Sequence, residues 1–223
     1  IEKINQMVIK NQTLIKEIYM SGGEPFYIPY NHVLLKQITN KDIPIRVNTN
    51  MHWTPKNKLF QVLKTFNNVQ LTMSADALYD KFNYIRNGSN WNTFMENLRF
   101  VKQNTNFDIR VNTIFSVINA IDICNLIKFF YFEEQIQDIT INTLHSPKEI
   151  DSRNYPSNKK EKIVNDIKEL INTISTKHIN LINNLKNCIN QIQLDKEYEY
   201  NNCLDSITKS HTKKWQLIFE DLV

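Results

Sequence analysis

Glycine and alanine are scarce in this chain. Of 223 residues only three are glycine and three are alanine, whereas asparagine, lysine and isoleucine are abundant. Codons rich in A and T encode the abundant residues, so the composition indicates an A/T-rich genome, as viruses and small bacterial genomes have. Asparagine-rich stretches are therefore weak evidence for loops here. Each remaining glycine marks a place where the backbone is expected to need it.

Cysteine is equally rare, with single residues at Cys124, Cys188 and Cys203. Their number is odd, their gaps are wide and no pair has Cys-x-x-Cys spacing, which argues against a disulfide framework and a zinc ribbon. We expect buried or half-buried free thiols in a reducing compartment.

Long apolar runs are missing as well. No window holds eighteen apolar residues, so the sequence predicts no transmembrane helix. With 41% hydrophobic and 22% charged residues, the chain suits a soluble globular protein with one sizeable core. It starts at Ile1 without an initiator methionine or a signal-peptide pattern, which suggests a fragment or processed chain and gives no sign of secretion. We expect a cytoplasmic protein.

The net charge of +4 is unevenly placed, since residues 1–110 carry +6 and residues 111–223 carry −2. A basic first half suits an anionic ligand or a nucleotide. The excess is too small and too scattered to predict nucleic-acid binding.

Strand-like and helix-like segments alternate up to residue 144. Period-two or buried apolar runs predict strands at 14–20, 43–47, 69–74, 107–115 and 136–144. Apolar faces at helical spacing predict helices at 31–39, from 54 onward, at 91–102 and at 121–132. This rhythm predicts an α/β fold with a mainly parallel sheet, either doubly wound or a complete or partial barrel. Ligands of both architectures bind beyond the carboxyl ends of the strands.

The alternation stops after residue 144. We expect helices from a Ser157 cap onward and at 178–193, an irregular stretch at 196–205 and a helix at 212–222. The sequence thus predicts a core over 1–146 and a mainly helical extension over 147–223.

Small or polar residues follow every predicted strand. They are Ser21–Pro25, Asn48–Asn50, Ser74–Asp76 with Arg86–Gly88 beyond, Asn112, and finally Asn142 and His145. A shared polar ligand site would need such groups. A histidine in the place of His145 is more often a structural hydrogen-bonding group than an acid or base.

The first of these strand ends carries two adjacent glycines, Gly22 and Gly23. They free the backbone to turn sharply and to expose carbonyl groups, Glu24 adds a carboxylate and Pro25 stiffens the exit. Carbonyls with a carboxylate suit an ammonium group, whereas phosphate would want amides at a helix start and a nearby lysine. A plain turn with Glu24 as a solvated first-turn acid explains these residues equally well.

The segment Ser21–Pro25 resembles the Gly-Gly-Glu motif of radical S-adenosylmethionine (SAM) enzymes. In that family the motif ends the second strand of a partial (β/α)6 barrel and binds the amino group of SAM. The resemblance implies that fold for residues 14–145, here without its first strand and cluster loop.

Further segments resemble the family in the same order. Asn48–Asn50 resembles its Thr-Asn-Gly with Met51 in the place of glycine, and Ser74–Asp76 resembles its Ser-x-Asp near the SAM ribose. Tyr84–Gly88 resembles its Ile-Arg-x-Gly, whose arginine reaches the SAM carboxylate. Asn112 and Asn119 match its fifth strand and the following helix start. The resemblance implies SAM-binding residues Gly22, Gly23, Glu24, Pro25, Asn50, Ser74, Asp76, Arg86 and Asn112.

One family motif is missing. Radical SAM enzymes bind a [4Fe–4S] cluster through Cys-x-x-x-Cys-x-x-Cys, and this sequence has no such spacing. Residues 1–12 resemble what remains of the helix after that motif, so we expect the chain to begin just downstream of it and to be inactive as given. The alternative is a clusterless relative that binds SAM or a nucleotide, or acts as a scaffold. Cys188 and Cys203 are too few for an auxiliary cluster.

For the intact protein, the resemblance implies a [4Fe–4S] cluster, SAM and a 5′-deoxyadenosyl radical that abstracts hydrogen from a small-molecule or peptide substrate. It implies an electron donor such as flavodoxin or ferredoxin, and no membrane or nucleic-acid partner. The tail, from Leu144–Pro147 to Trp215–Leu222, resembles the twitch extensions of phage-borne radical SAM proteins, so a phage-infected host is as suitable a source as a bacterium. No metal ligand and no catalytic residue is predicted within the chain.

Overall fold

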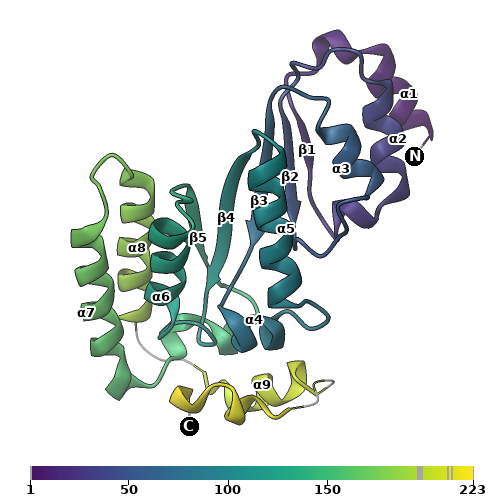
Figure 1. Cartoon of the computed structure of the whole chain (residues 1–223). Helices are drawn as coiled ribbons and strands as arrows, with labels where there is room; N and C mark the ends of the chain where they lie inside the picture. Colours follow the sequence, from purple (N-terminus) through teal and green to yellow (C-terminus); the bar gives the residue numbers. More distant parts are fainter. Residues whose placement is uncertain (1, 195–197, 210, 212, 223) are drawn as a thin grey trace. The chain divides into compact units, whose positions relative to one another are not determined.

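A computed structural model describes residues 2–194, 198–209, 211 and 213–222 (Figure 1). The chain divides into two compact units. The first comprises Ile1–Ser74 and Asn92–Arg110, and the second comprises Ala75–Trp91 and Val111–Val223. These two units do not test the predicted division into a core over residues 1–146 and an extension over residues 147–223, which stays a prediction.

Five strands form one open sheet in the order β1-β2-β3-β4-β5. Their bounds are Ile18–Met20, Ile45–Thr49, Val69–Ser74, Asp108–Phe115 and Ile139–Thr143. The strand pairs β1–β2, β2–β3 and β4–β5 are parallel. Sequential parallel neighbours joined by helices confirm the predicted α/β class and its partial-barrel form.

The first unit contains β1, β2 and β3 in register, with Ile18 opposite Ile45 and Ile45 opposite Val69. Along β2 and β3 side chains alternate between buried and half-buried, as strands with one covered face do. The helices α1 (Glu2–Lys10), α2 (Pro29–Gln37) and α3 (Lys58–Leu63) contact one another in sequence order, and most of α5 (Trp91–Asn104) also belongs to this unit (Figure 1).

Stacked aromatic rings form the core of the first unit. Trp53 lies between Phe26 and Phe60, with ring centroids 4.5 and 4.9 Å away. Phe60 is fully buried and also meets Phe100 and Phe107, at 5.6 and 6.0 Å. These rings fix the loops after β1 and β2 against α3 and α5, because Phe26 follows the glycine loop and Trp53 follows β2.

Asn57 sets the start of α3. Its side-chain oxygen accepts hydrogen bonds from the backbone amides of Leu59 and Phe60, at 2.8 and 3.4 Å, and its amide donates to the carbonyl of Phe26 at 2.9 Å. This cap explains why the helix begins at Lys58 and not at Thr54–Pro55, so the predicted start was wrong.

We expect Asn57→Ala to lower the free energy of unfolding by about 1–2 kcal/mol, since one cap and one tertiary hydrogen bond are lost. Urea unfolding measures the change, with the exposed neighbour variant Lys56→Ala as control. Equal midpoints for the two variants would show that the cap contributes nothing.

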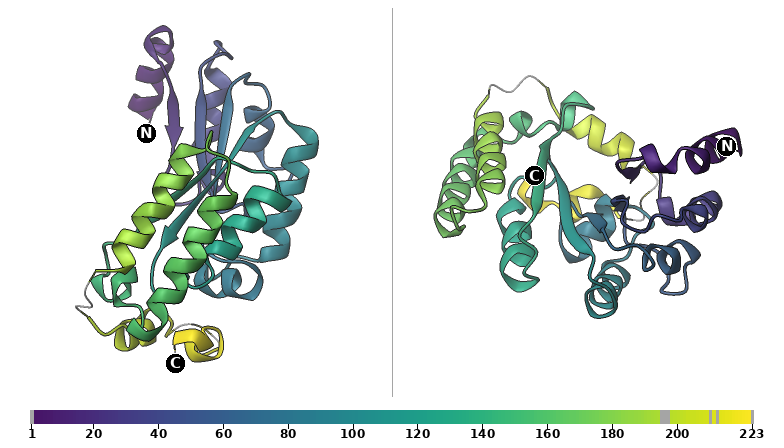
Figure 2. Two further views of the ribbon diagram at one scale, coloured as in Figure 1. Left: turned by 90° about the vertical axis from the view of Figure 1, so that its left-hand side faces the viewer. Right: turned by 90° about the horizontal axis from the view of Figure 1, so that it is seen from above.

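The second unit contains β4 from Val111 onward, which pairs with β5 from Val111 opposite Ile139 to Phe115 opposite Thr143. Its helices are α4 (Tyr79–Ile85), α6 (Ile123–Lys128), α7 (Ser157–Thr173), α8 (Ile179–Ile192) and α9 (Asn201–Ile207). A π-helical turn, η3 (Phe129–Glu133), continues α6. Figure 2 shows α7 and α8 side by side, and α8 packs on β5.

Several predicted bounds were wrong at their ends. The first strand begins at Ile18, because residues 12–14 form a 3-10 turn and Leu14 is 76% exposed. Ser157 is the first residue of α7 and not its side-chain cap.

The tail also differs from expectation in its details. Residues 201–207 form α9 where an irregular stretch was predicted, and residues 215–217 and 220–222 form 3-10 turns (η6 and η7) where a helix was predicted. The predictions for residues 196, 197 and 212 lie outside the described residues.

The cysteines match the prediction. Cys124 and Cys188 are buried, Cys203 is half-buried, and all three are free thiols. Burial in apolar surroundings raises the pKa of Cys124 and of Cys188 to about 12, so both stay protonated at neutral pH. Within the described residues, no helix is both long enough and apolar enough to cross a membrane.

Candidate functional site

The loop after β1 depends on its two glycines. Gly22 has φ +84° and Gly23 has φ +55°, a left-handed conformation that side chains rarely adopt. A Cβ built on either residue meets nothing within 4 Å. Backbone conformation and not crowding therefore requires glycine here, and the space over the loop is open to a ligand that approaches the backbone.

Glu24 ties this loop to the end of β2. One carboxylate oxygen accepts the backbone amide of Asn50 at 2.7 Å, and the other accepts the hydroxyl of Thr49 at 2.9 Å. The second oxygen also accepts the amide of Phe26 at 3.2 Å, which caps the 3-10 turn η2 (Pro25–Tyr27). The alternative of a solvated first-turn acid was wrong, because this carboxylate is half-buried and accepts three protein donors.

Burial makes the charge of Glu24 costly. Desolvation raises the pKa of Glu24 above its ordinary value, and the hydrogen bonds from Asn50, Phe26 and Thr49 offset only part of that rise. A carboxylate held in this state gains from any cation placed beside it.

Met51 takes the place of the glycine in the motif that the sequence resembles. Its backbone keeps the conformation that glycine favours, with φ 60°, and its side chain is fully buried. The buried amide of Asn97 holds the turn by donating to the carbonyls of Met51 and Trp53, at 2.7 and 2.6 Å. Core packing and Asn97 therefore stabilise a backbone that the family builds with glycine.

We expect Met51→Gly to be more stable than Met51→Ala by about 1 kcal/mol, since both lose the same buried side chain and only glycine removes the left-handed strain. In ordinary helices and strands this order is the reverse. Urea unfolding of the two variants gives the sign directly, and a more stable alanine variant would contradict the strain argument.

In the second unit, Asp76 follows β3 and pairs with Arg86 at 2.7 Å. The other carboxylate oxygen of Asp76 accepts the backbone amide of Ile114 at 2.9 Å and lies 3.5 Å from the hydroxyl of Thr113. Asn119 donates to the backbone carbonyls of Asp76 and Ile114, at 2.9 and 2.6 Å. Asp76 is thus a fixed anchor that joins the loop after β3 to β4.

Arg86 has donor capacity left over. Its guanidinium bonds Asp76 through one terminal nitrogen, and its Nε is buried with no hydrogen-bond partner among the described residues. Buried donors are seldom left unpaired, and a guanidinium pairs carboxylates through two nitrogens at once. The arrangement fits a ligand carboxylate at Arg86.

The remaining predicted residues take simpler places. Asn50 accepts the amide of His52 at 2.8 Å, and Ser74 is the half-buried last residue of β3. Asn112 accepts the amide of Asn142 from the neighbouring strand at 2.7 Å. Pro25 is buried as the first residue of η2.

His145, after β5, is 75% exposed and close to two partners. Its Nε2 lies 3.2 Å from the Thr143 hydroxyl and its Nδ1 lies 4.0 Å from the buried carboxylate of Asp151. Gln191 and the backbone amide of Arg153 already satisfy that carboxylate. The contacts agree with a structural hydrogen-bonding histidine.

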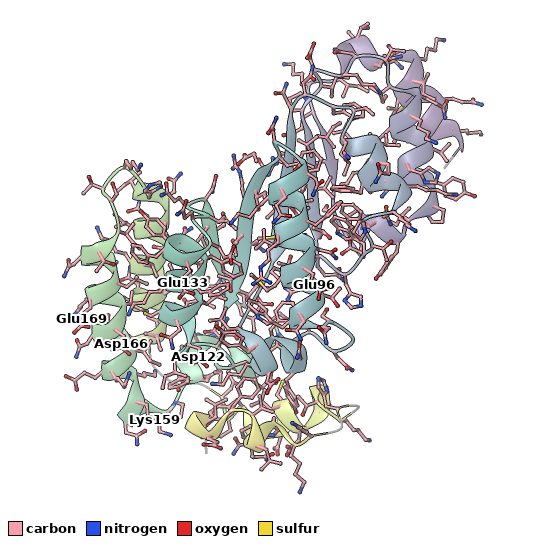
Figure 3. The ribbon with its side chains drawn as sticks, viewed as in Figure 1. Glu96, Asp122, Glu133, Lys159, Asp166 and Glu169 are labelled. Atoms are coloured by element: carbon pink, nitrogen blue, oxygen red, sulfur yellow. The ribbon has the colours of Figure 1, made fainter. Side chains whose placement is uncertain are left out.

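A surface cavity of about 540 Å³ lies elsewhere in the second unit. Leu78, Tyr79 and Phe129 supply apolar wall, and Figure 3 labels Asp122 and Glu133, which line it from the start of α6 and the end of η3. No predicted site residue lines this cavity. The strand ends and not this hollow carry the polar groups that the sequence singled out.

The comparisons with known proteins decide the family. The model of the radical SAM superfamily matches residues 1–128. The chain belongs to the radical SAM superfamily. No curated protein matches the sequence.

The fold agrees with this assignment. The chain is similar to a crystal structure of Streptococcus suis SuiB bound to S-adenosylmethionine, with 16% sequence identity and a TM-score of 0.57, over 76% of this chain and 39% of SuiB. A second crystal structure of S. suis SuiB gives 16% identity and a TM-score of 0.54, over 77% of this chain and 40% of SuiB. At this identity the likeness shows the radical SAM fold, and the chain spans about two fifths of the length of SuiB.

The structure joins the predicted site residues in two groups. In the first unit Glu24 contacts the backbone of Asn50, and in the second unit Asp76 contacts Arg86. Sequence reasoning placed Thr49 at a polar strand end without a role, and it missed Asn97; both hold the turn at Met51. Asn97 lies inside a helix of an asparagine-rich chain, and the sequence gives no sign that its side chain is buried.

Proposed function

We propose that the protein to which this chain belongs is a radical SAM enzyme, and that the strand-end residues bind SAM. The observation that carries the proposal is the loop after β1, where open glycine backbone beside a desolvated carboxylate suits the ammonium group of SAM. In the second unit, taken by itself, Arg86 with its unpaired buried Nε suits a carboxylate.

On the family's pattern, the residues of the first unit bind the amino group of SAM. Gly22 and Gly23 supply backbone carbonyls for the amino group, while Glu24 supplies charge and holds the loop in shape. Pro25 begins the 3-10 turn that follows that loop, and the backbone amide of Asn50 donates to Glu24 from the end of β2.

In the second unit, Arg86 takes the SAM carboxylate, and Asp76 keeps the guanidinium in place. On the family's pattern, Asp76 and Asn112 of this unit belong to the ribose region, and in the first unit Ser74 has the same role. Asp76 already accepts three protein donors, so its main contribution is to orient its neighbours.

When bound, a [4Fe–4S] cluster and SAM would supply reductive carbon–sulfur cleavage to a 5′-deoxyadenosyl radical and hydrogen abstraction from the substrate. The described residues contain no group of three or more His, Cys, Asp or Glu side chains suited to a metal, and residues 1–223 contain no Cys-x-x-x-Cys-x-x-Cys spacing. The chain's own residues bind, orient and shield SAM.

The partners and location follow as proposals. We propose a small-molecule or peptide substrate, an electron donor of the flavodoxin or ferredoxin type, and a cytoplasmic site of action. The residues 147–223 are proposed to be a twitch-like extension of the core.

The test uses the full-length protein to which this chain belongs, reconstituted without oxygen with iron and sulfide and supplied with SAM and a reductant. We expect 5′-deoxyadenosine by liquid chromatography. SAM binding without 5′-deoxyadenosine would favour the clusterless binding protein, and no SAM binding would contradict the proposal.

Arg86→Gln is expected to weaken SAM binding about 10- to 100-fold, because one charge-assisted pairing is lost. Isothermal titration calorimetry on the reconstituted protein measures it. The control is Lys162→Gln, which removes a charge of the same sign from the surface of α7. Equal affinities for the two variants would remove Arg86 from the proposed site.

A further inference from the structure

The last residues of the chain pack on α4, next to the proposed SAM residue Arg86. His211 Nε2 lies 2.8 Å from the backbone carbonyl of Tyr84, and the Tyr84 hydroxyl donates to the carbonyl of Lys213 at 3.1 Å. The Tyr84 ring meets the rings of His211 and Phe219, with centroids 4.5 and 5.6 Å away. The Lys81 ammonium lies 5.6 Å from the Phe219 ring.

This C-terminal clamp, which we define as residues 200–209, 211 and 213–222, has its own internal bonds. Trp215 donates to Asp205 at 2.6 Å, and the Tyr200 hydroxyl donates to the carbonyl of Leu222 at 2.7 Å. Tyr200, Trp215 and Phe219 are buried, and α9 contacts the turn at residues 148–150. The clamp is therefore a folded element, and its contacts with Tyr84 can hold the end of α4 in place.

The contact with Tyr84 acts on the end of a helix. α4 ends at Ile85, so the Tyr84 carbonyl is one of the last-turn carbonyls that have no partner further along the helix. A carbonyl only accepts, so His211 Nε2 donates to it and caps the helix from the side.

Arg86 continues directly from that capped turn. Its backbone amide donates to the Phe82 carbonyl at 3.0 Å, and its own carbonyl accepts the amide of Ser89 at 2.8 Å. Its guanidinium then reaches Asp76 at 2.7 Å. Any shift of the last turn of α4 moves the guanidinium relative to Asp76.

We propose that the C-terminal clamp positions Arg86 for the SAM carboxylate, with His211 and Tyr84 as the positioning residues. The proposal rests on the proposed function, because it concerns how the same residue binds SAM. It gives the end of the chain a part in cofactor affinity that is separate from any contact with the substrate.

A double-mutant cycle tests the clamp on the reconstituted protein, with the dissociation constant of SAM as readout. We expect His211→Ala to weaken binding about three- to tenfold in the wild-type background, and to have no further effect when Arg86 is already glutamine. Tyr84→Phe, which keeps the ring and loses one hydrogen bond, should follow the same pattern with a smaller change.

Two further variants separate positioning from folding. His211→Gln can still place a donor near the Tyr84 carbonyl and should restore most of the affinity, whereas Lys209→Ala changes an exposed side chain of the clamp and should leave affinity unchanged. Equal weakening by His211→Ala in both backgrounds would mean a general structural role and would overturn the proposal.

The outcomes also distinguish this inference from the proposed function. If His211→Ala leaves SAM affinity unchanged while Arg86→Gln lowers it as expected, the positioning role of the clamp is wrong and the proposed function stands. If Arg86→Gln binds SAM as well as wild type does, Arg86 does not bind the SAM carboxylate, and the clamp has no role in SAM affinity.

Discussion

Replacing Asp76 by asparagine is expected to lower the free energy of unfolding by about 3 kcal/mol. The side chains of Asp76 and Arg86 are only 14% and 23% exposed, so their pairing is shielded from solvent. The new amide would turn an N–H group toward the guanidinium or toward the Ile114 amide. Either way, a buried donor meets another donor, and Arg86 keeps its charge without a counter-charge.

The matched control is Asp166→Asn. Asp166 pairs with Lys162 at 2.6 Å, as short as the Asp76 pair, but the two side chains are 36% and 65% exposed. Surface pairs of this kind contribute about 0.5 kcal/mol or less. Urea unfolding with both variants therefore isolates burial as the cause. Equal losses would show that the Asp76 pair is an ordinary surface contact.

A large loss at Asp76 would also predict weaker SAM binding in the same variant, because Arg86 would lose its fixed partner. An ion pair that already orders a ligand-binding arginine reduces the side-chain entropy that is lost when the ligand binds.

The sheet was largely predictable because its strands have a strong pattern. Val69–Ser74 alternates without interruption and was placed without error, and Asp108–Phe115 was missed by only one residue. Strand ends were also well placed, so the polar groups that follow them could be read from the sequence.

What failed depended on tertiary contacts. No helix was predicted at Tyr79–Ile85, and only its last two residues fell in the segment Tyr84–Gly88 that was assigned to the ligand. The helix has only seven residues and is stabilised by the clamp and by Trp91. The Asp76–Arg86 pair was also missed, as both residues were assigned to the ligand by resemblance alone. Spacing of ten residues across a loop and a short helix gives no signal of an ion pair.

The start of α3 shows a third kind of failure. Proline is common as the first residue of a helix, as Pro55 would be, yet α3 begins only after Asn57. The side chain of Asn57 donates to the carbonyl of Phe26, which lies far away in the sequence. The local preference of proline predicted a start at Thr54–Pro55, whereas the cap and the tertiary hydrogen bond of Asn57 place the start at Lys58.

Removing the carboxylate of Glu24 should have an equally large effect. Glu24→Ala leaves the amides of Asn50 and Phe26 and the Thr49 hydroxyl without their acceptor, so we expect a loss of about 3 kcal/mol in the free energy of unfolding. Glu24→Gln keeps one acceptor oxygen and should lose about half as much. Urea unfolding at neutral pH measures both, and an alanine variant as stable as wild type would contradict the network.

The glutamine variant also isolates the titration of Glu24. Desolvation raises the pKa of Glu24 in the folded protein, so the folded state holds the proton more tightly than the unfolded chain does. The stability that this group contributes is therefore greatest below its unfolded pKa of about 4.3 and falls as pH rises through the raised folded value. Wild type measured against Glu24→Gln should lose relative stability over that window.

SAM affinity should change in the opposite direction over the same window. An ammonium group binds the ionised carboxylate better than the protonated one, so affinity for SAM rises as Glu24 loses its proton, and binding releases protons at pH values near the raised pKa. Calorimetry in buffers of different ionisation enthalpy detects that release, and Glu24→Gln should show neither the rise nor the protons. A stability that falls with pH while affinity rises is the signature of a carboxylate that is kept desolvated for a cation. If stability rose with pH instead, the hydrogen bonds to Glu24 would outweigh its desolvation. If affinity did not change with pH, Glu24 would be an ordinary loop anchor, and the Gly22–Gly23 backbone would have to bind the amino group alone.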